Sequence, residues 1–141
     1  MPLAKLVALH EVPESDCRRV AAPQFAVVIA RNAGAAVLVF NLYRKVWELP
    51  GGFIDPGESA REAAQRELLE EAECQGRDFH WLGLVEISDG TTYFGAVFAC
   101  EVDEVPATVR NEEVSGIAHW RPGTTLQPLG ATDAALLDRF A

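Results

Sequence analysis

The chain has few cysteines, no long hydrophobic run and a shortage of basic residues. Its three cysteines (Cys17, Cys74 and Cys100) are odd in number and lack metal-type CxxC spacing, which indicates reduced thiols rather than a disulfide framework. No apolar stretch resembles a membrane span or a secretory signal, so we expect no membrane partner and a cytoplasmic location. The 12 Lys and Arg residues are outnumbered by 21 Asp and Glu residues. The resulting net charge of −9 argues against binding of long nucleic acid, which normally requires a basic face.

Length and composition are typical of one soluble domain. The 141 residues can bury one ordinary core, and the 49% hydrophobic and 23% charged fractions are those of a globular protein. No internal repeat or low-complexity tract marks a boundary, so we predict a single domain over residues 1–141. The oligomeric state is left open, with a homodimer as one option.

The pattern of apolar and turn residues predicts a mixed α/β (α+β) fold. Apolar, β-branched runs bounded by turn signals predict strands at residues 4–12, 25–31, 35–41, 46–49, 79–87, 92–102 and 114–120. Two helices are predicted, one from about Ala60 to Gly76 and one over residues 132–140 with Thr132 as its cap. Together these elements predict an α/β/α sandwich, with the helices on opposite faces of a mixed sheet.

The start of the first helix has strong local signals. Asp55-Pro56-Gly57 fits a type II turn, with proline second and glycine third. Ser59 is a suitable N-cap, and Glu62 three residues later completes a capping box. The apolar stripe of this helix is predicted to contain Ala64, Leu68 and Ala72.

Three glutamates of this helix form the main candidate site. Glu67, Glu70 and Glu71 stand at i, i+3 and i+4, which places them on one helix face. Such carboxylates repel one another, and a hard cation with oxygen ligands would reverse that repulsion. A solvated, glutamate-rich helix is the alternative, but it would not need the Gly51-Gly52 pair or an acid just before its N-cap.

The segment resembles the signature of the Nudix hydrolase family, a loop, helix and loop that bind metal for diphosphate cleavage. The matching residues are Gly52, Glu58, Arg66, Glu67, Leu68, Glu70 and Glu71. The chain departs from the signature where the family has glycine and then an aliphatic residue, because Glu73 and Cys74 stand there. Without that glycine we expect the helix to continue towards Gly76.

The resemblance implies a Mg²⁺- or Mn²⁺-dependent hydrolase and suggests its metal ligands. These would be the carbonyl of Gly51 and the carboxylates of Glu67, Glu70 and Glu71, with one glutamate acting as the base. The family often adds an acid from a loop before a late strand. Glu112 and Glu113 are candidates here, Glu113 being preferred, although both also fit exposed loop acids.

Four other residues receive supporting roles. Arg66 lies within one turn of Glu62 and Glu70 and is predicted to orient carboxylates through ion pairs. Glu58 is predicted to accept backbone hydrogen bonds or to assist the metal site, so both residues join Glu67 and Glu70 in the catalytic set. Gly52 and Arg44 are predicted to contact substrate, Arg44 through its phosphate, although a lone loop cation is more often solvated. A glycine at position 51 lets the chain approach the metal without a clashing Cβ.

The substrate class follows from the resemblance, and the individual substrate stays open. The signature implies cleavage of the pyrophosphate linkage in a small nucleotide, a nucleoside diphosphate linked to another moiety, with a nucleoside triphosphate as one option. ADP-ribose or a nucleotide sugar is the enzymatic alternative, and a nucleotide-binding sensor without catalysis is the alternative of another class. Five aromatic residues could stack on a base, or they could simply be core or sheet residues: Tyr43, Trp47, Phe53, Tyr93 and Phe94.

Overall fold

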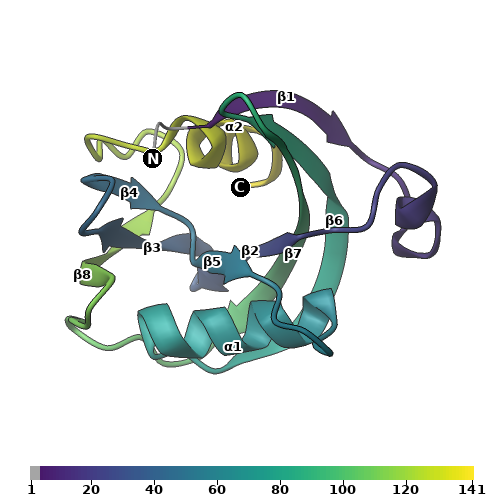
Figure 1. The fold of residues 1–141 in the computed structure, drawn as a ribbon. Helices are drawn as coiled ribbons and strands as arrows, with labels where there is room; N and C mark the ends of the chain where they lie inside the picture. The colour runs from purple at the N-terminus through teal and green to yellow at the C-terminus, as the bar shows by residue number, and fades with distance from the viewer. Residues whose placement is uncertain (1–3) are drawn as a thin grey trace.

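A mixed sheet of eight strands separates two helices in the computed structural model, which describes residues 4–141 (Figure 1). The helices are α1, Ala60–Ala72, and α2, Ala131–Phe140. The strands are β1 (Lys5–His10), β2 (Phe25–Asn32), β3 (Ala35–Asn41), β4 (Val46–Glu48), β5 (Gly51–Phe53), β6 (Gly76–Ser88), β7 (Thr92–Val102) and β8 (Val114–Trp120). The predicted α/β/α arrangement is confirmed.

The order of the strands explains why the sheet is mixed. The main path runs β1-β6-β7-β2-β3-β4, with β5 paired to β2 and β8 paired to β3. β2 and β7 are parallel, while β2 and β3 form the predicted antiparallel hairpin. Its turn contains Ala33 and Gly34, which both have positive φ, as a hairpin turn that follows the strand twist requires. The connection between β4 and β5 brings the Gly51-Gly52 pair against the central strand β2.

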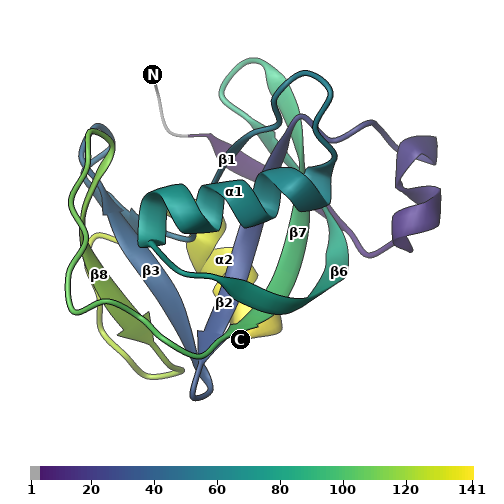
Figure 2. The ribbon, with the colours of Figure 1, turned by 90° about the horizontal axis from the view of Figure 1, so that it is seen from below.

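Each face of the sheet has its own hydrophobic core. Successive side chains of a strand point to opposite faces, so Val28 of β2 packs towards α1 while Ile29 packs towards α2. The α1 core receives the predicted stripe of Ala64, Leu68 and Ala72, all fully buried. The α2 core receives Leu136 and Leu137. α1 lies against both β2 and β5, which sets its residues beside the Gly51-Gly52 strand (Figure 1 and Figure 2).

The N-terminus of α1 is as predicted, but its C-terminus is not. The hydroxyl of Ser59 accepts the Glu62 N–H, and the Glu62 carboxylate accepts the Ser59 N–H, which completes the capping box. The helix ends at Ala72, so the prediction that it continues towards Gly76 is wrong. Glu73 adopts the left-handed conformation, with φ 54° and ψ 35°, and its N–H caps the Leu69 carbonyl. The helix therefore ends in the left-handed conformation that glycine usually adopts, although the residue here is Glu73.

Replacing Glu73 with Gly should stabilise the protein by about 1 kcal/mol, because a residue with a Cβ is strained at this φ and glycine is not. We expect the midpoint of thermal unfolding to rise by roughly 3 °C in a circular dichroism melt. An unchanged or lower midpoint would show that the Glu73 side chain contributes more than the strain costs.

Several smaller features escaped prediction. A short 3-10 helix, η1 (Glu14–Arg19), follows β1 and contacts β6. The Gly51-Gly52 segment belongs to a strand, β5 (Figure 1). β6 begins at Gly76, before the predicted residue 79, and α2 begins at Ala131 with Gly130 as its N-cap instead of Thr132. These segments are short or irregular, and their pairing partners lie far away in the sequence.

The structure bears on the cysteines and on membrane-spanning helices. Cys17, Cys74 and Cys100 are free and buried, as predicted for reduced thiols. Within residues 4–141, no helix combines the length and the apolar character that crossing a bilayer requires.

Candidate active site

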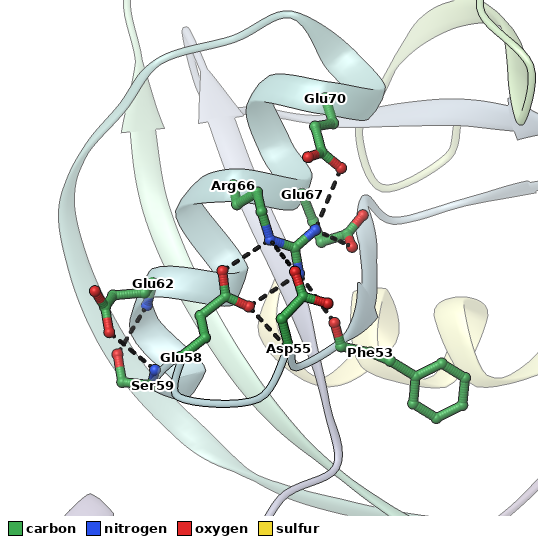
Figure 3. A network of polar contacts seen from close by, with 8 residues as sticks. All are labelled: Phe53, Asp55, Glu58, Ser59, Glu62, Arg66, Glu67 and Glu70. Carbon is green, nitrogen blue, oxygen red and sulfur yellow. Dashed lines mark hydrogen bonds and ion pairs between the residues drawn. The ribbon is translucent and has the colours of Figure 1, made fainter.

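Arg66 of α1 is the centre of a carboxylate network (Figure 3). Its Nε and Nη2 donate to the two carboxylate oxygens of Glu58 at 2.8 and 2.9 Å, a paired, fork-like contact. Its Nη1 donates to Glu67 at 2.8 Å and to Glu70 at 3.2 Å. Nη2 also donates to the Phe53 carbonyl at 3.0 Å, which ties α1 to β5. One guanidinium thus fixes three carboxylates and the glycine-containing strand.

Glu58 accepts hydrogen bonds at the start of α1. Besides its paired contact with Arg66, it accepts the Asp55 N–H at 3.0 Å and so closes the turn before α1. The Arg66 contact, followed by the Asp55 N–H, holds the pKa of Glu58 below its ordinary value. Asp55 lies 3.3 Å from Arg66 Nε and was not anticipated. Glu62, expected to pair with Arg66, is instead engaged by the capping box.

Glu67 and Glu71 point inward from α1 to the Gly51-Gly52 strand. Only 8% of Glu67 and 4% of Glu71 is exposed, whereas the Glu70 side chain is 59% exposed and turns towards Arg66. Glu71 accepts the Gly51 N–H at 2.8 Å. A Cβ placed on Gly52 would lie 2.5 Å from a carboxylate oxygen of Glu67. The second glycine therefore makes room for a buried carboxylate.

Burial makes charge on these two glutamates costly. Desolvation is the main reason that the pKa of Glu67 is raised, although Arg66 opposes it. Desolvation also raises the pKa of Glu71 to about 8, opposed by the Gly51 N–H and reinforced by the charges of Glu67, Glu48 and Glu113. The helix thus places two carboxylates where their negative charge lacks a sufficient counter-charge.

Replacing Gly52 with Ala should lower turnover by about 10–100-fold, because the new methyl group displaces the Glu67 carboxylate. Gly57→Ala is the matched control. Gly57 has φ +81°, but its substituted Cβ would meet nothing within 4 Å, so this change should lower stability without lowering turnover. Steady-state kinetics with thermal melts would test the pair, and equal turnover in Gly52→Ala and the parent would contradict the close approach.

The donor set fits a hard divalent cation. Carboxylate and carbonyl oxygens are the ligands that Mg²⁺ prefers. The strand Gly51–Phe53 contacts the carboxylate cluster through the Gly51 N–H, which Glu71 accepts, and through the Phe53 carbonyl, which accepts from Arg66. As they are placed, no three acidic, histidine or cysteine side chains of residues 4–141 form a metal-holding group. The reason is that Glu67 and Glu70 face Arg66, while Glu71 faces the Gly51 N–H. Joint ligation of a metal ion would require these side chains to rotate away from their present partners.

A pocket of about 210 Å³ opens beside the glycine strand. Its walls include Phe25, Val27 and Leu49, and its mouth includes Phe53, which is 57% exposed and packs edge-on against Tyr93. Gly51 and Gly52 also line the pocket, and the Glu67 and Glu71 carboxylates, which do not line it, contact the same two glycines. An apolar space next to a charged centre is typical of a small-molecule site.

The polar wall of this pocket is a network around Glu48. Arg44 donates two hydrogen bonds to Glu48, at 2.9 and 3.2 Å, and Asn41 donates a third at 2.7 Å. The Asn41 side-chain oxygen in turn accepts the N–H groups of Tyr43 and Arg44, which fixes the loop. Arg44 is therefore held in place by a carboxylate and is not a freely solvated loop cation.

Asp133 forms another part of the pocket wall. Its carboxylate accepts the Leu49 N–H at 2.9 Å, which fastens the first turn of α2 to the end of β4. Burial is the main reason that its pKa is raised to about 7, with the charge of Glu48 adding to the effect.

Residues 21–140 match the model of the NUDIX domain family. The chain belongs to that family. The recognition based on the sequence is therefore confirmed, and the network described above occupies the family's signature segment.

Curated NUDIX relatives match over part of their length. An RNA pyrophosphohydrolase of Afipia carboxidovorans is 42% identical over 71 residues, which cover 50% of this chain and 39% of that protein. A Bacillus subtilis protein provisionally named an 8-oxo-dGTP diphosphatase is 53% identical over 51 residues, 34% of this chain and 33% of that protein. The chain spans less than two fifths of the length of these relatives.

Solved NUDIX structures share the fold. A MutT NUDIX hydrolase from Burkholderia pseudomallei has a TM-score of 0.75 at 20% identity, covering 84% of this chain and 98% of that chain. A pyrophosphohydrolase from Bacillus subtilis has a TM-score of 0.68 at 22% identity, covering 96% and 82%. At these identities the likeness establishes the architecture alone.

The structure brings together most of the residues that the sequence singled out. Gly51, Gly52, Glu67 and Glu71 meet at one point, and Glu58, Arg66 and Glu70 surround it. Arg44 lies across the adjoining pocket. Glu113 is exposed, and its charge is one of the causes that raise the pKa of both Glu67 and Glu71. The choice of Glu113 over Glu112 stays a prediction.

Sequence reasoning missed the residues that hold the NUDIX site from outside the signature. Asn41 and Glu48 fix Arg44, and Asp133 fixes the end of β4. Asn111 was also missed, although an Asn two residues before a candidate acid is a recognisable side-chain turn signal.

Proposed function

We propose that this NUDIX protein is a hydrolase that cleaves the pyrophosphate linkage of a small nucleotide with the help of Mg²⁺ or Mn²⁺. The observation that carries the proposal is the pair of buried carboxylates, Glu67 and Glu71, at the glycine strand beside an open pocket. Two poorly compensated negative charges would be stabilised by a dication, and a diphosphate would complete its ligands.

The proposed ligands are the Gly51 carbonyl and the carboxylates of Glu67, Glu70, Glu71 and Glu113. When bound, a divalent cation would neutralise phosphate charge and activate water for attack on phosphorus. Arg66 holds Glu67 and Glu70 in their directions, and Glu58 holds Arg66. A glutamate of the cluster, with Glu67 or Glu70 as candidates, would accept the proton of the attacking water.

The pocket supports the placement of the substrate. We place the diphosphate over Gly52 and the carboxylates, with the nucleoside between the apolar wall and the Phe53–Tyr93 pair. Arg44 would face substrate oxygens with the terminal nitrogen that its two Glu48 contacts leave free. Aromatic stacking and one fixed cation would then orient the nucleotide.

A second candidate substrate is the 5′-triphosphate end of RNA. The observation that favours it is the similarity, over half of this chain, to the RNA pyrophosphohydrolase of Afipia carboxidovorans. The net charge of −9 disfavours it, because each added nucleotide brings another phosphate to an acidic protein.

A substrate screen separates these candidates. Purified protein would be offered nucleoside triphosphates, including oxidised ones, ADP-ribose, nucleotide sugars and short triphosphorylated RNA, each with Mg²⁺ and with Mn²⁺. We expect hydrolysis of free nucleotides to be fastest, with ¹⁸O from labelled water appearing on one product phosphate. Preference for the RNA would select the second candidate. If the protein bound a nucleotide tightly but formed no product, we would conclude that it is a nucleotide sensor and not a hydrolase.

Three expectations stay predictions. These are a single domain over residues 1–141, a cytoplasmic location and the option of a homodimer. Size-exclusion chromatography with light scattering would decide the oligomeric state.

A further inference from the structure

The loop before β8 is organised by one side chain, Asn111. Its amide oxygen accepts the N–H of Glu113 at 2.9 Å and that of Val114 at 3.0 Å, which makes a local turn. Its amide nitrogen donates to the main-chain carbonyl of Glu70 at 3.1 Å. One amide group therefore connects the loop carrying Glu113 to the helix carrying Glu70 and Glu71.

The contact with Glu70 uses a group that the helix leaves available. The last four carbonyls of an α-helix have no partner within the helix, and α1 ends at Ala72. The Leu69 carbonyl accepts the Glu73 N–H, and the Ala72 carbonyl accepts the Cys74 thiol. Asn111 supplies the partner for the Glu70 carbonyl. An amide can do this while closing its own turn, because it carries a donor and an acceptor on one planar group.

The main chain of Glu113 is consequently fixed on both sides. Its N–H donates to Asn111, and its carbonyl accepts the Leu42 N–H at 2.8 Å. The Asn111 N–H donates to the Val114 carbonyl at 3.0 Å and closes the turn from the other side. The Glu113 side chain is exposed and makes no hydrogen bond with the rest of residues 4–141, so the place of its carboxylate depends on this main-chain clamp.

We infer that Asn111 is a positioning residue: its bond to the Glu70 carbonyl holds the loop that carries Glu113 against α1, the helix that carries Glu67 and Glu71. The inference rests on the proposed metal-assisted hydrolysis, and it adds that metal affinity depends on a neutral side chain that touches neither metal nor substrate. Partners of this kind typically change metal affinity or activity by about 10–100-fold. A purely local loop role would change thermal stability alone.

Asn111→Asp separates the two possibilities, because it keeps the turn acceptor, loses the donor to Glu70 and adds a negative charge. If only local charge mattered, the variant would bind Mn²⁺ more tightly than the parent. If the clamp positions Glu113, the loop moves away from α1 and Mn²⁺ binding weakens by about tenfold. The binding of Mn²⁺ alone would be measured by electron paramagnetic resonance, with Asn111→Ser as a second variant without added charge.

A double-mutant cycle identifies the residue through which Asn111 acts. In a Glu113→Gln background, Asn111→Asp and Asn111→Ser should change Mn²⁺ affinity by less than about twofold, because the carboxylate they position is gone. Glu112→Gln is the matched control, since Glu112 is an exposed acid of the same loop. It should leave Mn²⁺ affinity unchanged.

The outcomes are distinct from those that test the proposed function. Parent-like or tighter Mn²⁺ binding in folded Asn111→Asp and Asn111→Ser, or an undiminished effect in the Glu113→Gln background, would overturn the inference. A protein that binds Mn²⁺ in an Asn111-dependent way but hydrolyses no nucleotide would overturn the proposed function and leave the clamp standing. Thermal melts would confirm that each variant is folded.

Discussion

Replacing Glu71 with Gln is expected to lower turnover by about 10³-fold and, at the same time, to stabilise the metal-free protein. Gln can still accept the Gly51 N–H, so the contact between α1 and the glycine strand survives. The variant lacks the negative charge that binds a dication. It also avoids the unfavourable free energy of burying that charge. We expect the free energy of unfolding at pH 8 to rise by on the order of 2 kcal/mol in urea titrations.

The pH dependence supplies an independent control. Burial raises the pKa of Glu71 from 4.5 to about 8, so the folded protein keeps a proton that the unfolded chain releases above about pH 4.5. Stability that Glu71 contributes at low pH is therefore lost as pH rises towards about 8. The stability difference between variant and parent should grow through this window, without metal. A constant difference, or a variant that keeps parental turnover, would contradict the assignment of Glu71.

Replacing Arg66 with Met is expected to destabilise the protein by about 2 kcal/mol and to lower turnover by about 100-fold. Removal of the guanidinium leaves Glu58, Glu67 and Glu70 without their shared partner. Breaking a fully buried ion pair costs about 3–5 kcal/mol, and the smaller value reflects the 25% exposure of the Arg66 side chain. Urea unfolding and steady-state kinetics would measure both effects.

Two control variants make this result specific. Arg66→Lys keeps the charge but cannot make the paired contact with Glu58, so it should fall between parent and Met variant. Arg19→Met removes an arginine that is 85% exposed and lies 3.8 Å from Asp16, and its stability should stay within about 0.5 kcal/mol of the parent. If Arg66→Met and Arg19→Met behaved alike, Arg66 would not be the centre of a network.

The parts of the fold that could be predicted are those specified by local sequence. The β2–β3 hairpin has its turn signal between two apolar runs, and α1 has a capping box next to its apolar stripe. The C-terminus of α1 was predicted wrongly because Glu73 adopts a conformation that local preference disfavours. That conformation belongs to the tertiary structure, in which Cys74 enters the core directly after the turn.

In the candidate site, too, local sequence predicted some residues, whereas the partners from distant parts of the chain were missed. Glu67 and Glu71 could be placed on one helix face from their spacing, and Gly52 from its place in the signature. The partners from other parts of the chain could not, because no local pattern indicates that Asn111 reaches the Glu70 carbonyl or that Asp133 reaches the Leu49 N–H. Nor did spacing reveal that Glu70 stays exposed while its neighbours are buried.

A Mn²⁺ titration followed by electron paramagnetic resonance tests the central claim most directly. The parent protein should bind Mn²⁺ saturably, Glu71→Gln should lose that binding, and Glu73→Gln should keep it, because Glu73 is an exposed acid on the same helix end. Equal Mn²⁺ binding by all three proteins, or no binding by the parent even with nucleotide present, would contradict the assignment of Glu67 and Glu71 as the metal-binding centre.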